Sequence, residues 1–154
     1  MSQFESMFSP AASGDAPAIA ALFLAARAMA MPWLTSPHTD DDTSRWVAEV
    51  LVPSSTLRVA RVDDVPEAML MVANGWIDHL YVAPAWQGRG IGSQAVEVAK
   101  ALFPAGLELW TFQRNNVARR FYERRGFLPV EFTDGTGNEE REPDVRYVWS
   151  PGSR

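Results

Sequence analysis

The sequence predicts a single mixed α/β domain spanning residues 1–154, with the element order β-α-α-β-β-β-α-β-α-β-β. Several short stretches alternate apolar with polar residues and are separated by Asp-Asp and Asn-Gly turns, which indicates strands joined by hairpins. Other stretches carry apolar residues at helical spacing. The hydrophobic fraction of 47% in 154 residues is enough to bury one continuous core.

The first half of the chain is expected to contain one strand followed by two helices. A short strand is predicted at residues 3–8. The first helix runs from Asp15, as its N-cap, to about residue 30, with Pro17 in its first turn. A second helix begins at residues 39–42, where three aspartates suit the positive end of a helix, and it ends before Pro53.

In the second half of the chain the sequence predicts strands interrupted by two helices. Gly126 follows the second of these helices in the position that favours a left-handed residue. The strands are expected at residues 56–62, 66–73, 76–82, 107–112, 127–132 and 145–149, and the helices at 90–103 and 115–125.

Composition excludes several kinds of chemistry. Cysteine is absent, so disulfides, thiolate nucleophiles and cysteine-based metal sites are excluded. Two histidines without an H-E-x-x-H motif argue against a metallohydrolase, and no metal site is expected. The net charge of −5 makes general nucleic-acid binding an unfavoured function. The N-terminus lacks the basic start of a signal peptide and no apolar run is long enough for a membrane span, so we expect a cytoplasmic protein with no membrane partner.

The most informative segment is LYVAPAWQGRGIGS at residues 80–93. A strand leads into the glycine-rich turn at residues 87–92, and a helix begins there. Glycines let the backbone approach a ligand closely, and the unpaired amides of a helix start attract anions. Arg89 adds a cation. The turn therefore predicts a diphosphate-binding site.

Other readings of this turn fit less well. A dinucleotide fold needs G-x-G-x-x-G, but the sixth residue counted from Gly88 is Ser93. The P-loop pattern needs G-K-[ST], which the sequence lacks. A plain tight turn with no ligand is the ordinary alternative for these residues.

Two motifs resemble the Gcn5-related N-acetyltransferase (GNAT) superfamily. Gln87-x-x-Gly90-x-Gly92 is similar to its Q/R-x-x-G-x-G/A signature. Downstream, NNVARRFYERRGF at residues 115–127 resembles its N-x-x-A-x-x-F/L-Y-x-x-x-G-F block. The resemblance covers residues 76–128, and before these only the order of elements agrees.

The resemblance implies an N-acetyltransferase that moves an acetyl group from acetyl-CoA directly to an amine in a ternary complex. It also implies a mixed, mostly antiparallel central sheet, flanked by helices and splayed between its fourth and fifth strands, with the arm of the cosubstrate in the gap. Residues 80–82 would pair with that arm through their backbone, the turn with Ser93 would hold the pyrophosphate, and Asn115 would bind the arm. The implied cosubstrate contacts are Leu80, Tyr81, Val82, Gln87, Gly88, Arg89, Gly90, Ile91, Gly92, Ser93, Asn115, Phe121 and Tyr122.

Acyl transfer to an amine requires a proton donor for the departing thiolate and a stabiliser for the developing oxyanion. By family analogy Tyr122 is the proton donor near the sulfur, although its spacing also fits a core aromatic residue. The backbone amide of Val82 is the expected oxyanion donor.

A base that accepts the proton of the amine is the third requirement. Asp78 is favoured for this role, with His79, Glu108 and a water relay as alternatives. Strict strand alternation would place Trp76, Asp78, Leu80 and Val82 on one face of the sheet, and Ile77, His79 and Tyr81 on the other.

The amine acceptor, a small molecule or a protein amine, is expected opposite the cosubstrate, near the first two helices and the loop at residues 133–144. Met31, Pro32, Trp33, Leu34, His38 and Trp46 offer an aromatic and apolar wall. In or beside the loop, Asp134, Glu139, Glu140, Glu142 and Asp144 outnumber Arg141 and Arg146. This excess of acids favours a cationic amine, and a solvated loop beside a homodimer surface is the alternative.

Two other functions on the same fold stay open. One is a non-catalytic domain that senses acyl-CoA, against which the retention of Asn115 and Tyr122 argues. The other is a toxin that acetylates aminoacyl-tRNA, which the net charge disfavours. A cluster of arginines nevertheless lies on and beside one helix, at Arg114, Arg119, Arg120, Arg124 and Arg125.

Overall fold

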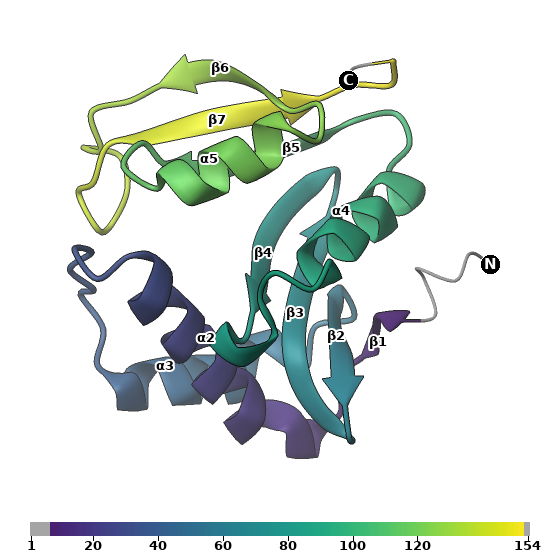
Figure 1. The fold of residues 1–154 in the computed structure, drawn as a ribbon. Helices are drawn as coiled ribbons and strands as arrows, with labels where there is room; N and C mark the ends of the chain where they lie inside the picture. Colours follow the sequence, from purple (N-terminus) through teal and green to yellow (C-terminus); the bar gives the residue numbers. More distant parts are fainter. Residues whose placement is uncertain (1–6, 153–154) are drawn as a thin grey trace.

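The computed structural model describes residues 7–152, which form a seven-stranded sheet in the order β1-β2-β3-β4-β5-β7-β6 (Figure 1). Neighbouring strands are antiparallel except for β4 and β5. The strands are β1 (Ser9–Pro10), β2 (Leu57–Val62), β3 (Val65–Ala73), β4 (Trp76–Val82), β5 (Leu107–Phe112), β6 (Leu128–Phe132) and β7 (Asp144–Trp149). The α-helices are α2 (Ala16–Ala30), α3 (Asp40–Trp46), α4 (Ile91–Leu102) and α5 (Asn116–Glu123).

The order of elements confirms the predicted mixed fold, and the largest difference in boundaries is at the first strand. The first strand was expected at residues 3–8, but β1 is Ser9–Pro10, which pairs with β2. Residues 3–6 of the expected strand lie outside the described residues. The hairpin turns follow their sequence signals, because Asp63, Asp64, Asn74 and Gly75 all have positive φ angles.

The sheet splays between β4 and β5, as the fold class predicted. The two strands are parallel and share a single register pair, Trp76 with Glu108, supported by a 2.8 Å hydrogen bond from the Glu108 amide to the Gly75 carbonyl. Beyond this point β4 pairs with β3 alone and β5 pairs with β7. The sheet is therefore two half-sheets, β1–β4 and β5-β7-β6, joined at one end and open at the other (Figure 1).

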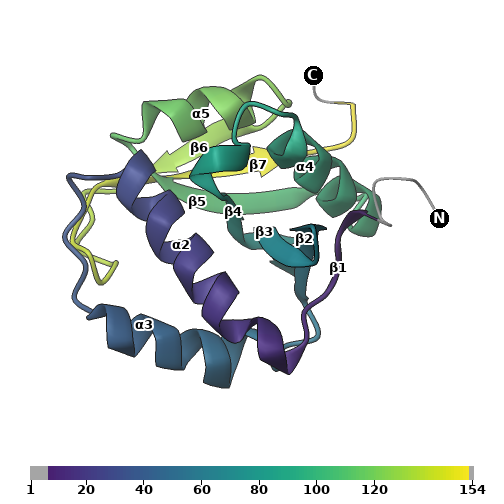
Figure 2. The ribbon, with the colours of Figure 1, turned by 60° about the horizontal axis from the view of Figure 1, so that its bottom comes forward.

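Helices cover both faces of the sheet and bury two separate cores. Figure 2 shows α2 and α3 on one face, with α4 on the other. The first core lies under α4 and α5 and contains Leu70, Val98, Leu107, Phe127 and Tyr147, among others. The second lies under α2 and α3 and contains Ile19, Phe23, Val47, Val59 and Met69, among others.

A β-bulge interrupts β4 at Asp78. In the register with β3, His79 is opposite Met71 and Ile77 is opposite Val72, so Asp78 is an extra residue without a partner. A bulge of this kind shifts the phase of side-chain alternation by one residue.

Because of the bulge, Ile77 lies on the other face of the sheet from the one that strict alternation predicts. Leu80 and Val82 pack with the first core, and His79 and Tyr81 face α2, as alternation predicts. Ile77, however, packs in the first core beside Leu80 and Val82 and not on the side of His79. The sequence could not reveal this, because WIDHLYV alternates equally well with or without an inserted residue.

The two N-terminal helices are held by polar contacts at their starts. Asp15 precedes α2 and forms two hydrogen bonds with the Arg61 guanidinium, at 2.6 and 2.8 Å. Thr39 caps α3 by accepting a hydrogen bond from the Asp42 amide. A π-helical turn, η2 (Val47–Leu51), follows α3 directly.

The Asp15–Arg61 pair yields a stability prediction. The hydrogen bond from Arg61 lowers the pKa of Asp15, so the pair stabilises the fold above the ordinary carboxyl pKa and loses this effect as the pH falls through the lowered value. Asp15→Asn should reduce the free energy of unfolding at pH 7 by about 1–2 kcal/mol in urea titrations. The gap between variant and parent should shrink below about pH 4.

The control for this prediction is Asp63→Asn, which removes the same charge in a turn whose positive φ asparagine tolerates. Its stability should stay close to that of the parent. Equal stabilities of Asp15→Asn and parent at pH 7, or a gap that persists in acid, would contradict the role of the pair.

Candidate functional site

The glycine-rich turn lies at the open end of the splay and begins α4. Gly88 and Gly90 have φ angles of +76° and +84°, a left-handed conformation that side chains disfavour. Gly90 is the N-cap residue of α4, so the first amides of the helix are left for an outside acceptor. Arg89 is exposed and lies 4.7 Å from the centre of the Trp86 ring. These features match the predicted anion cradle.

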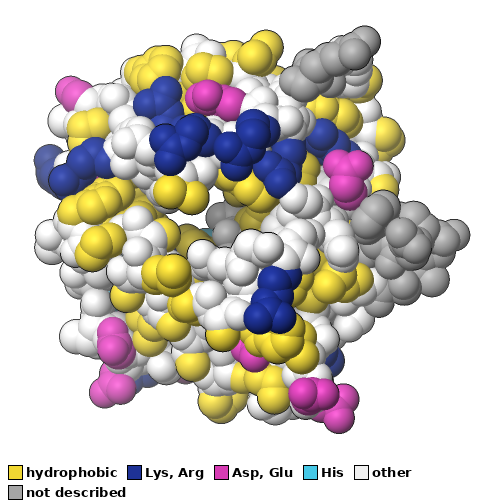
Figure 3. Space-filling model, viewed as in Figure 1, with side chains coloured by type: hydrophobic (Ala, Val, Ile, Leu, Met, Phe, Trp, Pro, Cys, Tyr) yellow, Lys and Arg dark blue, Asp and Glu magenta, His cyan; other side chains and the backbone are white. Residues whose placement is uncertain are grey.

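A hollow opens beside this turn. Figure 3 shows it at the centre of the molecule, with a row of Lys and Arg side chains over α5 along its upper edge. Arg114, Arg120 and Arg124 are exposed, whereas Arg119 is held by the Tyr147 hydroxyl at 2.9 Å. A protein of net charge −5 thus presents positive charge where an anionic ligand would enter.

The start of α4 is fixed against α5 through a contact of three residues. Arg125 donates hydrogen bonds to the Ser93 hydroxyl and to the Phe121 carbonyl, and its guanidinium lies 3.7 Å from the centre of the Phe121 ring. A Cβ added at Gly92 would lie 3.3 Å from the same ring. Gly92 is therefore needed for close packing of the two helices, and the cradle is held rigidly.

The end of β4 is tied to the turn and faces the gap. The Gln87 side-chain amide donates to the Val82 carbonyl at 3.0 Å. The register pairs residues 79–82 with β3 and not with β5, so this edge of β4 is open. The Ala83 amide bonds the Glu67 carbonyl of β3, and successive strand residues alternate, so the backbone groups of Leu80 and Val82 face the open side and those of Tyr81 face β3. The Leu80 groups and the Val82 amide are thus available to an extended ligand.

Asn115 and Tyr122 frame the other side of the gap. Asn115 caps α5, because its Oδ1 accepts from the Ala118 amide at 3.2 Å, which leaves the side-chain nitrogen as its donor. Tyr122 is buried and makes edge contacts with Phe121 and Phe127. Burial, and then the nearby Tyr81 phenol, raise the pKa of Tyr122 well above its ordinary value. The Tyr122 hydroxyl therefore keeps its proton at neutral pH.

The three base candidates lie in different surroundings. Asp78 is exposed on the bulge, and partial loss of solvation raises its pKa. His79 lines a cavity, and burial, together with the nearby Arg27, lowers its pKa to about 4, so it is neutral. Glu108 is paired with Arg146 where β4 and β5 still meet.

A cavity of about 830 Å³ lies between α2, α3 and the loop before β7. Its wall includes Met31, Leu34, His38 and Trp46, as expected for the acceptor side. Trp33, expected in the same wall, is not part of it. This ring lies against the Arg114 guanidinium at 4.1 Å and Phe112 at 6.2 Å, toward the β5 half-sheet.

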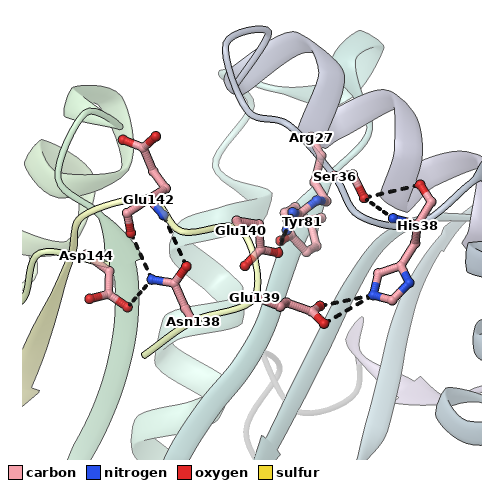
Figure 4. A network of polar contacts seen from close by, with 9 residues as sticks. All are labelled: Arg27, Ser36, His38, Tyr81, Asn138, Glu139, Glu140, Glu142 and Asp144. Atoms are coloured by element: carbon pink, nitrogen blue, oxygen red, sulfur yellow. Dashed lines mark hydrogen bonds and ion pairs between the residues drawn. The ribbon is translucent and has the colours of Figure 1, made fainter. Parts of the chain in front are cut away.

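The loop at residues 133–144 crosses to the side of α2 and is ordered by its own polar contacts (Figure 4). Glu139 and Glu140 line the cavity, and His38 and Arg27 are their partners. The other expected acids do not line it: Glu142 pairs with Arg114. Asp134 bonds within its own turn, and Asp144 bonds Asn138 and Thr133.

Phe23, Arg27, Asp40 and Asp42 are among the cavity residues that sequence reasoning missed. The spacing of Phe23 and Arg27, four residues apart, places them on one face of α2, and this was the available signal. Asp40 and Asp42 were interpreted only as favourable charges at the start of a helix.

Among residues 7–152, no three His, Asp or Glu side chains are grouped so as to share a metal ion. In the same range no helix has the length and apolar character needed to cross a membrane.

Comparison with known proteins places this site in a family context. The sequence profile described as "Acetyltransferase (GNAT) family" matches residues 23–127. The peptidyl-lysine N-acetyltransferase YjaB of Salmonella typhimurium is 35% identical over 77 residues, which are 49% of this chain and 52% of that protein. The match thus spans about half the length of this curated relative.

Solved structures share the fold across nearly the whole chain. Apo YjaB of Escherichia coli superposes with a TM-score of 0.80 and 18% identity, covering 94% of this chain and 97% of that one. PaiA N-acetyltransferase of Thermoplasma acidophilum, solved in complex with coenzyme A, superposes with a TM-score of 0.69 and 18% identity, covering 93% and 97%.

The geometry of the cradle generates a binding prediction. Gly90→Glu places a carboxylate and a strained side chain where the helix amides await an anion, so the affinity for acetyl-CoA should fall more than about tenfold. Isothermal titration calorimetry measures it. Gly90→Ala, which adds the strain without the charge, should retain more affinity.

Gly14→Glu is the matched control, since it adds the same charge where a new Cβ meets nothing within 4 Å. Its affinity should equal that of the parent. Undiminished binding by Gly90→Glu would show that the anion does not occupy this turn.

Proposed function

The chain belongs to the acetyltransferase (GNAT) family, and from this premise we propose that it transfers the acetyl group of acetyl-CoA directly to an amine in a ternary complex. The observation that carries the proposal is the open edge of β4 beside the glycine-rich start of α4. This arrangement offers an extended backbone for an amide-bearing arm and a helix N-terminus for its phosphates. Acetyl-CoA supplies the activated thioester.

The cosubstrate contacts follow from the positions of the side chains and backbone. The amides at residues 88–93, with Arg89 beside them, would hold the pyrophosphate. The backbone of residues 80–82 would pair with the pantetheine amides, and the Asn115 side-chain nitrogen would donate from the facing helix. Phe121, packed against Gly92, would form the floor under the arm.

Tyr122 is proposed as the proton donor to the departing thiolate. Its hydroxyl is protonated at neutral pH and so has a proton to give, although burial raises its pKa and makes it a weaker acid than a free phenol. The Val82 amide, at the end of β4, is proposed to stabilise the oxyanion.

The amine enters from the cavity beside α2 in this proposal. The relative YjaB of Salmonella is named for peptidyl-lysine, and a solved structure of similar fold, NatC, was bound to a Gag peptide and CoA. Protein amines and small amines therefore both belong to the proposed substrate range. A non-catalytic acyl-CoA sensor is the alternative function, and release of free CoA in the presence of amines distinguishes the two.

The sequence favours Asp78 as the general base, and the position of His79 in the cavity wall makes it a second candidate. Asp78 lies on the bulge outside the cavity wall, whereas His79 lines the cavity and is neutral. A neutral imidazole accepts a hydrogen bond from an amine, although a pKa near 4 makes it a weak base. We keep Asp78 as the proposed base and His79 as the second candidate.

Replacing Tyr122 tests its proposed role as the proton donor to the departing thiolate. Tyr122→Phe should lower kcat by about 10²-fold and leave the KM for acetyl-CoA nearly unchanged, because only the transferred proton is lost. Steady-state assays of CoA release measure both constants. Tyr147→Phe, the same chemical change at a phenol held by Arg119 and Glu123, should retain kcat. A Tyr122→Phe enzyme with normal kcat would refute the assignment.

Two variants separate the base candidates. Asp78→Asn should lower kcat at neutral pH by about 10²-fold if this carboxylate accepts the amine proton, and His79→Gln should then act mainly on the KM of the amine. The opposite result would transfer the role to His79. Normal kcat in both variants would leave Glu108 or a water relay as the base.

A further inference from the structure

The residues that line the cavity beside α2 indicate which kind of amine it would bind. Its wall combines aromatic rings, chiefly Phe23 and Trp46, with four carboxylates, and Arg27 is its one arginine or lysine among the described residues. The two histidines of the wall are His38 and His79, of which His79 is neutral. At neutral pH the wall is therefore negative, although the face that receives the cosubstrate is positive. The carboxylates belong to Asp40, Asp42, Glu139 and Glu140.

Glu140 is the most unusual of these acids. Its side chain is only 16% exposed, and its partner is the Arg27 guanidinium at 3.6 Å, well beyond the 2.6 Å of the Arg61–Asp15 pair. Within residues 7–152 its carboxylate receives no hydrogen bond, and neither oxygen is fully buried. Glu140 also lines a neighbouring cavity of about 710 Å³ beside β5. A carboxylate so largely withdrawn from water gains much from a closer cationic donor.

Arg27 has partners besides Glu140. One of its guanidinium nitrogens donates to the Tyr81 hydroxyl at 2.9 Å, and the guanidinium lies 5.1 Å from the centre of the Phe23 ring. Tyr81 belongs to the end of β4 that receives the cosubstrate in the proposed function. Arg27 is thus held toward β4, and its ion pair with Glu140 stays long at 3.6 Å.

His79 is a second polar group in the wall of this cavity. No hydrogen bond to either ring nitrogen occurs among residues 7–152, and its neighbours are the rings of Phe23, Trp46 and Tyr81. The imidazole is half-buried and its nitrogens are not fully enclosed by protein. An amine in the cavity would give it a hydrogen-bond partner.

The acids also lie in two separate places. Figure 4 shows Glu140 beside Arg27 and Tyr81, and Glu139 turned the other way toward His38. Asp40 and Asp42 belong to the first turn of α3, and hydrogen bonds from Thr39 lower the pKa of Asp42, which keeps it charged. The four acids of the wall thus come from two segments of the chain, the first turn of α3 and the loop before β7, and Phe23 and Trp46 line the same cavity. Acids from two segments around an apolar wall suit a ligand with two cationic ends on an apolar chain.

We propose that this cavity selects an amine acceptor carrying a second positive charge, and that Glu140 is the carboxylate that binds one of the two cationic ends. The proposal rests on the acetyltransferase function proposed above and names the class of its acceptor. It favours a diamine over an uncharged-tail amine, and it disfavours an amino acid, whose carboxylate would face Glu139 and Glu140.

Three acceptors of equal length test the proposal: pentylamine, the corresponding terminal diamine, and the amino acid with its carboxylate at the far end. CoA release should give a kcat/KM for the diamine about tenfold or more above that for pentylamine, with the amino acid lowest. Glu140→Gln should remove most of this preference. A structural defect would lower both amines alike and leave their ratio unchanged.

Glu142→Gln is the matched control, because it makes the same change on the same loop at a residue paired with Arg114 outside the cavity. It should keep the preference for the diamine. Equal kcat/KM for diamine and pentylamine in the parent would overturn the proposal, as would an unchanged ratio in Glu140→Gln. A lysine peptide turned over in place of all three small acceptors would also overturn it, while preserving the acetyltransferase function. CoA release that no amine stimulates would overturn both this proposal and the acetyltransferase function.

Discussion

The single point at which β4 and β5 still pair determines the rest of this structure. Trp76 and Glu108 hold the two half-sheets together at one end, and the right-handed twist of each half then carries the strands apart. An open strand edge inside a protein leaves backbone donors and acceptors without partners, which is costly unless water or a ligand satisfies them. The splay is therefore costly unless a ligand fills it, and it is where acetyl-CoA is proposed to bind.

The remaining contacts keep this gap open at a fixed width. Arg125 links Ser93 at the start of α4 to the Phe121 carbonyl of α5, so the helices of the two half-sheets cannot drift independently. On the other face, the loop at residues 133–144 reaches from the β5 half-sheet to Arg27 and His38. The half-sheets are thus bridged on both faces, and the bridging residues lie at the two places where ligands are proposed to bind.

The sequence predicts the features that depend on neighbouring residues and does not predict those that depend on contacts between distant segments. The glycine-rich turn and the helix it opens were predictable, because positive φ angles and helix starts are dictated by local residues. The bulge at Asp78 was not, since it depends on the register with β3 and leaves no mark on the alternation of β4. Its consequence, the position of Ile77 beside Leu80, follows from pairing alone.

The acceptor side was predicted only in outline for the same reason. Arg27 and Tyr81 are 54 residues apart, and nothing local shows that their side chains meet. Trp33 was expected in the cavity wall, but the Arg114 guanidinium on the opposite half-sheet holds it elsewhere. Long-range contacts of this kind select which acids face the cavity, so composition indicated a cationic acceptor before any particular carboxylate could be named.

Backbone amide hydrogen exchange, with and without acetyl-CoA, tests the central claim most directly. If the cosubstrate lies in the splay, amides on the open edge at residues 80–82 and those at residues 88–93 should gain protection together, and the core amides of β2 should not change. NAD should protect neither segment. Protection confined to the cavity beside α2, or none at β4, would contradict the account and leave the gap between β4 and β5 without a ligand.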